Sequence, residues 1–201
     1  MMLCVTACST EKNTAQSRWW HSFNTRYNVY YNGSVAYIDG ALEKEQGNKD
    51  NFTEIIPLYT VGNKSSRELG KANFDKAIKK SEKAIQLHSI KRRPIWNKNR
   101  RKTERDIEWL NRREYNPFLW KVWLMMGKAQ FHQGAFEEAA STFSYMSRLY
   151  QTQPSIYGKA RAWLAKTYVE QGWLYDAEDV IRNIQRDSLD WRAIKEWDYT
   201  Y

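Results

Sequence analysis

Residues 117–186 constrain the fold of this chain more than any other stretch, because small and large residues recur in them twice at matching offsets. The first copy contains Trp123, Met126, Gly127, Gly134, Phe136, Ala139, Phe143 and Met146, and the second contains Leu164, Ala165, Tyr168, Gly172, Leu174, Ala177, Ile181 and Ile184. Glycine tolerates the left-handed backbone conformation that often ends a helix, so Gly134 and Gly172 predict a turn inside each copy. Each copy is therefore expected to be a helical hairpin.

The small residues of each copy predict how its two helices pack. Gly127 and Ala165 allow the second helix to approach the first closely, and Ala139 and Ala177 are expected at the closest crossing. The large residues that follow return to one helical face at three- and four-residue spacing, so they are expected to fill the groove between neighbouring helices.

This order resembles that of the tetratricopeptide repeat (TPR). The two turn glycines lie slightly further apart than the roughly 34 residues of an uninterrupted array, so about four extra residues are expected between Gln151 and Ser155. Pro154 is expected to stop a helix there. The predicted fold is all-α, with TPR hairpins forming a short right-handed solenoid that continues past the C-terminal end of the sequence. An ordinary antiparallel helical bundle is the alternative.

Residues 1–8 resemble the end of a bacterial lipoprotein signal. Val5, Thr6, Ala7 and Cys8 have the order of a lipobox, in which the cysteine becomes the first mature residue and carries acyl chains. The apolar run is short and no Lys or Arg precedes it, so the native start is expected upstream. Residues 9–16 are then a polar tether. The alternative is an N-terminus in which the thiols of Cys4 and Cys8 have no function.

Residues 17–90 are expected to form an N-terminal helical region. Its first part is rich in aromatic residues, namely Trp19, Trp20, Phe23, Tyr27, Tyr30, Tyr31 and Tyr37. Packing in the core explains these residues better than a ligand cage does. Gly33 and Gly40 have the spacing of the glycines in the first copy, which favours a degenerate TPR-like hairpin here.

The net charge of +9 indicates an acidic partner, a membrane surface or a nucleic acid. Lysine and arginine are densest in residues 91–113, where Trp96 and Trp109 add stacking surfaces that suit single-stranded nucleic acid. Because acidic residues interrupt this run and no nucleic-acid-binding motif accompanies it, residues 91–116 are interpreted as a basic connector with a short helix. Residues 117–187 then hold the two TPR units, and residues 188–201 begin a further helix.

The inner helix of a TPR hairpin presents one face to a concave groove. The offsets place on that face Lys121, Leu124, Met125, Lys128, Phe131 and His132 of the first copy, and Lys159, Ala162, Trp163, Lys166 and Glu170 of the second. The lysines would attract carboxylates, and Phe131 and Trp163 would anchor an apolar side chain of a bound peptide or helix. Burial of some of these residues by neighbouring repeats is the alternative.

No catalytic motif is found in the sequence: there is no nucleophile elbow, phosphate loop or metal-spaced set of His and Cys residues. His21, His88 and His132 fall on separate expected helices, and packing or capping explains His132 better than a role in the groove. The chain is therefore predicted to be non-enzymatic, without cofactor or metal, and to bind protein partners, nucleic acid being unlikely.

Four stretches together resemble a known family. They are residues 8–13, 23–33, 75–89 and 114–131, and the most specific segments in them are Tyr-Asn-Val-Tyr-Tyr-Asn-Gly and Asn-Pro. In this order they resemble the N-terminal part of the SprE/PorW-type TPR lipoproteins of Bacteroidota, which are associated with type IX protein secretion and gliding motility. The resemblance implies a periplasm-facing outer-membrane lipoprotein that acts as a scaffold for partners in that machinery. A TPR lipoprotein for outer-membrane or cell-wall assembly is the alternative.

Overall fold

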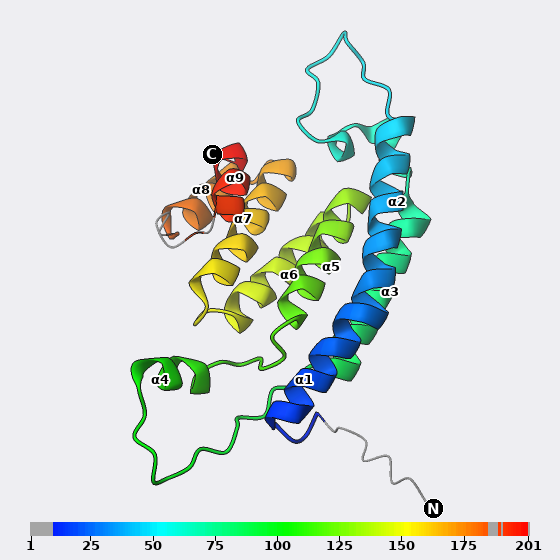
Figure 1. Ribbon diagram of the computed structural model, residues 1–201. Coiled ribbons are helices and arrows are strands. Elements are labelled where there is room, and N and C mark those ends of the chain that lie inside the picture. Colours follow the sequence, from blue (N-terminus) through cyan, green and yellow to red (C-terminus); the bar gives the residue numbers. More distant parts are fainter. Residues whose placement is uncertain (1–9, 185–188, 190, 201) are drawn as a thin grey trace, which may run out of the picture.

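The computed structural model describes residues 10–184, 189 and 191–200 of the chain. All regular structure in these residues is helical and they contain no strand, which confirms the all-α class. Successive long helices pack against one another, so the order of the helices in space follows their order in the chain (Figure 1).

The first three helical segments form one long rod. They are α1 (Ala15–Asn24), the π-helical segment η1 (Thr25–Tyr30) and α2 (Tyr31–Gly47), which follow one another without a break (Figure 1). Thr14 caps the first turn, because its side chain accepts a hydrogen bond from the backbone N–H of Ser17 at 3.1 Å. Further along, the Thr25 hydroxyl donates to the carbonyl oxygen of His21 at 2.6 Å, a competing bond of the kind that loosens a helical turn.

The rod corrects two predictions. The C-terminal end of the tether predicted over residues 9–16 is wrong, because Ala15 and Gln16 already belong to α1. Before them, the Asn13 side chain donates to the carbonyl oxygen of Arg92 at 2.6 Å. The predicted hairpin at Gly33 and Gly40 is also wrong, because both glycines lie inside α2. Cys8 and the predicted signal remnant lie outside the described residues.

A third correction concerns the aromatic residues of the rod. Trp19, Trp20, Phe23, Tyr27 and Tyr31 are exposed, with accessible fractions of 44–63%, so core packing is the wrong explanation for them. Tyr30 and Tyr37 are partly buried. The buried side of the rod instead carries mostly small residues, in the row Ser17, His21, Thr25, Val29, Gly33, Ala36, Gly40 and Lys44. Small side chains there let the following helices approach closely.

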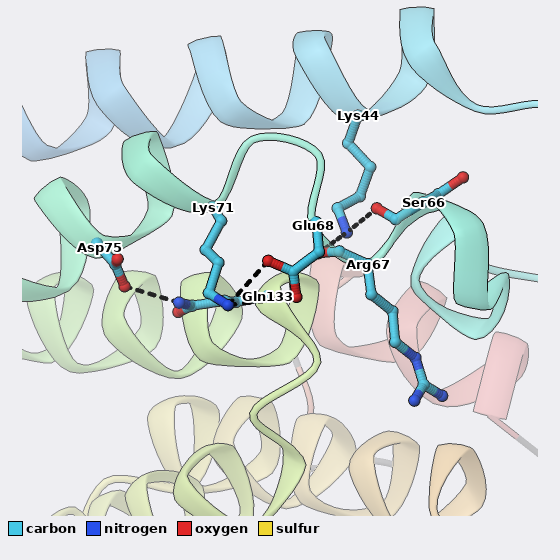
Figure 2. A network of polar contacts seen from close by, with 7 residues as sticks. All are labelled: Lys44, Ser66, Arg67, Glu68, Lys71, Asp75 and Gln133. Carbon is cyan, nitrogen blue, oxygen red and sulfur yellow. Dashed lines mark hydrogen bonds and ion pairs between the residues drawn. The ribbon is translucent and has the colours of Figure 1, made fainter.

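A long loop connects the rod to α3 (Lys71–His88), and it contains two short 3-10 turns, η2 (Thr60–Gly62) and η3 (Lys64–Ser66). Lys44 fastens the end of this loop to α2. Its buried ammonium donates to the carbonyl oxygens of Ser66 at 2.8 Å and Arg67 at 3.2 Å (Figure 2). Burial lowers the pKa of Lys44 to about 8.

The basic connector carries a short helix, α4 (Glu104–Leu110), as predicted. Thr103 and Asp106 form a capping box at its start, in which each side chain bonds the backbone N–H of the other. After the connector, α5 (Leu119–Gln133) packs against α3. Figure 2 shows one link between them, where the Gln133 side chain donates to the Asp75 carboxylate at 2.7 Å.

Two helical hairpins follow at the predicted places. α5 is paired with α6 (Phe136–Leu149), and α7 (Pro154–Glu170) is paired with α8 (Leu174–Arg182). Gly134 and Gly172 have φ angles of 83° and 78°, which confirms that glycine ends the first helix of each pair in the left-handed region. α6 ends at Leu149, so the chain leaves the helix at the predicted join, and Pro154 is the first residue of the next helix, α7.

The C-terminal helix α9 (Trp191–Thr200) packs against α7, as residues 188–201 were expected to begin a further helix. The main core lies between α5, α6, α7 and α8 and extends to α9 through Trp197. Phe143, Ala139 and Ala165 are fully buried in it.

Replacement of Gly127 by alanine tests the close approach of α5 and α6. A Cβ atom added at Gly127 would lie 2.5 Å from the ring of the fully buried Phe143. Alanine normally stabilises a helix interior by about 1 kcal/mol relative to glycine, but overpacking a core costs about 1–3 kcal/mol. We therefore expect Gly127→Ala to lower the free energy of unfolding, measured by urea denaturation. Phe143→Leu in the same background should relieve part of the loss, and an increase in stability for Gly127→Ala alone would contradict the packing.

Candidate binding pocket

A pocket of about 310 Å³ lies between α5, α7 and α9. Its lining residues are Trp120, Leu124 and Lys128 of α5, Lys159 and Trp163 of α7, and Lys195 and Glu196 of α9. The residues of α5 and of α7 recur every four positions, which places each set on one face of its helix. Three lysines, two tryptophans and one glutamate therefore meet in a single concavity.

The lysines of this region lie over aromatic rings. The ammonium of Lys128 is 4.5 Å from the ring centroid of Trp163, and that of Lys166 is 4.4 Å from the same centroid. The ammonium of Lys159 is 4.9 Å from the ring centroid of Trp120. Contacts of this kind hold a cation in place without neutralising it.

Glu196 of α9 pairs with Lys166 of α7. Lys166 is buried, and its ammonium donates directly to the Glu196 carboxylate. The ammonium also lies 5.0 Å from the ring centroid of Tyr59. Since a buried charge is costly without a partner, this ion pair ties α9 to α7 and closes one side of the pocket.

Among the cations that line the pocket, Lys128 differs in the contacts of its ammonium group. Within residues 10–184, 189 and 191–200, its ammonium makes no hydrogen bond or ion pair, and its close contact is the ring of Trp163. Burial lowers the pKa of Lys128; the Glu196 carboxylate opposes this, and the ammonium groups of Lys166 and Lys159 add to it. A bound carboxylate would favour the charged form of Lys128 and satisfy its donors.

Aromatic rings surround His132 next to Trp163 of the pocket. The ring of His132 stacks on Phe74, with centroids 6.0 Å apart, and meets Phe131 and Trp163 edge-on. Burial, with the nearby lysines, lowers the pKa of His132 to about 4, so its imidazole is neutral at pH 7. The residue serves packing, in line with the prediction from the sequence.

The structure brings together four of the predicted groove residues: Leu124, Lys128, Lys159 and Trp163 line the pocket. The others lie elsewhere. Four of them are buried, namely Met125, Phe131, Ala162 and Lys166. His132 packs among aromatic rings, and Glu170 is half-buried. The ammonium of Lys121 lies over the rings of Phe118 and Trp120. The assignment of the buried residues to an open groove is therefore corrected, because neighbouring helices cover them.

Sequence reasoning missed three lining residues. Trp120 precedes Leu124 by one helical turn, so extending the four-residue row backwards would have found it. Lys195 and Glu196 carry no local signal, since their place in the pocket depends on how α9 folds back on α7.

The fold and the pocket define an all-helical protein with a binding pocket of lysine and tryptophan side chains. No protein-family model matches the chain, and the comparison with curated proteins gives no match either. Of the described helices, none is long and apolar enough to cross a membrane. No group of three or more His, Cys, Asp or Glu residues in the described part of the chain is placed to hold a metal ion.

The lowered pKa of His132 predicts acid destabilisation. A histidine whose pKa falls from 6.5 to about 4 on folding contributes stability above its unfolded pKa, and this contribution is lost as the pH falls towards 4. We expect a loss of up to about 3 kcal/mol between pH 7 and pH 4 from this residue. Urea denaturation at several pH values should show a shallower loss for His132→Phe, which keeps the aromatic packing. Equal pH profiles for the two proteins would contradict the assignment.

The ion pair between Lys166 and Glu196 predicts that Glu196→Gln loosens α9. The Lys166 ammonium would lose its charged partner while the neighbouring helices still bury it, which costs about 1–3 kcal/mol. Amide hydrogen exchange in α9 should accelerate about tenfold or more. Glu178→Gln is the matched control, because Glu178 pairs with Arg182 on the exposed face of α8 and its loss should cost less than about 1 kcal/mol. Equal exchange in both variants would refute a role of the pair in holding α9.

Proposed function

We propose that this chain is a non-enzymatic adaptor that binds a carboxylate-bearing segment of a protein partner in the pocket between α5, α7 and α9. The observation that carries the proposal is the ammonium of Lys128, which lies over Trp163 in the pocket and bonds no carboxylate of the described residues. A partner's acidic side chain or C-terminal carboxylate would bond this ammonium. An apolar side chain beside it would pack on Trp120 and Leu124.

We further propose that the hairpins belong to a short, right-handed TPR solenoid. Its support is the match between motif and structure at Gly127, against which Phe143 of the second helix packs, and at Gly134 and Gly172, where the chain turns. Such an array presents a concave surface made by the first helix of each hairpin. In such an array the pocket would lie on that surface, because α5 and α7 would be these first helices.

The biological setting is a proposal that rests on the sequence. The lipobox-like order before Cys8 and the resemblance to the SprE/PorW-type lipoproteins support a periplasm-facing outer-membrane lipoprotein. Its partners would then be components of the type IX secretion and gliding-motility machinery. A scaffold of this kind needs no cofactor and no catalytic residue.

The test is capture of partners from the native cells by the tagged full-length chain after crosslinking. Lys128→Glu with Lys159→Glu reverses the charge of the pocket, so capture of envelope secretion components should fall at least about tenfold. Lys166 is not used, because its buried ammonium pairs with Glu196 and its replacement would break that ion pair. Lys79→Glu with Lys83→Glu is the matched control, since both lysines are exposed on α3.

Equal capture by the pocket variant and the control would remove the pocket from the function. Nuclease treatment and a salt wash before mass spectrometry separate the alternative. Recovery of ribosomal or nucleoid proteins that disappears with nuclease would move the function to the basic residues 91–113 and overturn the adaptor proposal.

A further inference from the structure

A second, larger cavity of about 590 Å³ lies at the N-terminal end of α1, away from the binding pocket. It is formed by residues 11–15 and Arg18 on one side, and by residues 92–95 and Trp109 on the other. Lys12, Arg18, Arg92 and Arg93 contribute four cations to its lining, whereas Glu11 contributes one carboxylate. The side chain of Ile95, also in the lining, is fully exposed.

The three arginines of this cavity donate to neutral oxygens. Arg18 donates to the side-chain oxygen of Asn13 at 2.6 Å, and Arg92 donates to the carbonyl oxygen of Glu11 at 3.0 Å. Arg93 donates to the side-chain oxygen of Asn111 at 3.4 Å. None of the ion pairs formed among the described residues includes these arginines. Their charges line one cavity in which the cations outnumber the single carboxylate of Glu11, which suits an anionic group such as a phosphate.

The adjoining face of the rod carries the exposed aromatic residues. Trp19, Phe23 and Tyr27 form a continuous row, with ring centroids 5.5 Å apart for the first pair and 4.9 Å apart for the second. The row borders a shallow cavity of about 350 Å³, which Arg26 also lines. The guanidinium of Arg26 lies 5.0 Å from the ring centroid of Tyr27. The aromatic row and the guanidinium of Arg26 therefore share this face.

The arginine cavity and the aromatic row belong to one surface. Arg18 of the arginine cavity lies one helical turn before Ser22, which lines the shallow cavity beside the row, so the two cavities adjoin along one face of the helix. In Figure 1, α1 and the basic connector around α4 lie at the same end of the molecule. An exposed apolar row of this size marks an interaction site.

We propose that this surface docks on an anionic phospholipid bilayer, with a lipid phosphate in the arginine cavity and the aromatic row in the headgroup region. Tryptophan and tyrosine favour the membrane interface, where one edge of the ring is apolar and the other is wet. Arginines beside them attract the headgroups of anionic lipids. The charge complementarity favours a phospholipid surface over an apolar protein helix, which would leave the arginines unpaired. This contact would act in addition to any acyl chain on Cys8, because a single weak membrane signal rarely suffices.

Vesicle binding by the full-length chain tests the proposal, with Cys8→Ala in every sample so that no acyl chain contributes. The probes are phosphatidylcholine vesicles with and without phosphatidylglycerol, and the readout is co-sedimentation. We expect binding only when phosphatidylglycerol is present. Arg18→Gln, Arg92→Gln and Arg93→Gln together should weaken it at least about tenfold. The matched control is Lys98→Gln, Arg101→Gln and Arg105→Gln, which removes the same charge from exposed positions of the same connector outside the cavity.

A second pair of variants tests the aromatic row. Trp19→Gln with Phe23→Gln should also weaken binding about tenfold, because both rings are exposed and can leave the interface without disturbing the core. Tyr175→Gln with Tyr199→Gln is the control, since these exposed rings lie on α8 and α9. Circular dichroism checks that all variants are folded.

Three outcomes would overturn the proposal. The first is equal loss in the cavity variant and its charge-matched control, which would mean that the net charge alone attracts the vesicles. The second is equal binding to both kinds of vesicle. The third is absence of vesicle binding together with tight, salt-sensitive binding of a single-stranded RNA oligonucleotide, which would assign the arginines to nucleic acid.

Discussion

The arrangement of the helices depends on a buried polar contact just before α5. The carboxylate of Glu114 accepts hydrogen bonds from the backbone N–H groups of Ile90 and Asn116, at 2.9 and 2.8 Å. The amide of Asn116 then donates to the hydroxyl of Thr25 at 3.1 Å and to the carbonyl oxygen of His88 at 2.9 Å. Burial raises the pKa of Glu114, while these hydrogen bonds counteract the rise. Because buried polar groups are costly unless they are bonded, the contact fixes the start of α5 against both the end of α3 and the π-helical segment of the rod.

The orientation of α5 decides which of its faces forms the pocket. With its start held, Leu119 and Val122 pack against the rod and α3, and the row of Trp120, Leu124 and Lys128 is left towards α7 and α9. α5 and α7 form two of the three walls of the pocket, and the packing of successive helices fixes the positions of both. The third wall depends on Glu196, whose partner Lys166 is buried in α7. The C-terminal wall of the pocket therefore depends on how α9 packs on α7, through this ion pair and through Trp197 in the core.

The sequence allowed prediction of the parts of this fold that repeat locally. The turn glycines of the hairpins and the buried Phe143 follow from offsets within one hairpin, as do Lys128 and Trp163 of the pocket. The rod was harder to predict, because hydrophobicity assigns its largest side chains to the core. In the structure, close helix packing selects the small residues for the buried face and leaves Trp19 exposed. The role of Glu196 could not be predicted, since it depends on a contact between residues thirty positions apart.

The positive charge of the chain gathers at two places that differ in chemistry. In the pocket, compact ammonium groups lie over indole rings, which suits a single carboxylate beside an apolar side chain. At the N-terminal end of the rod, planar guanidinium groups converge on one cavity, which suits the several oxygens of a phosphate. The first site uses α5, α7 and α9, whereas the second uses α1 and the basic connector, and they share no residue. Because neither ligand would compete for the other's residues, a chain held on a phospholipid surface by its rod would still present the pocket to a protein partner.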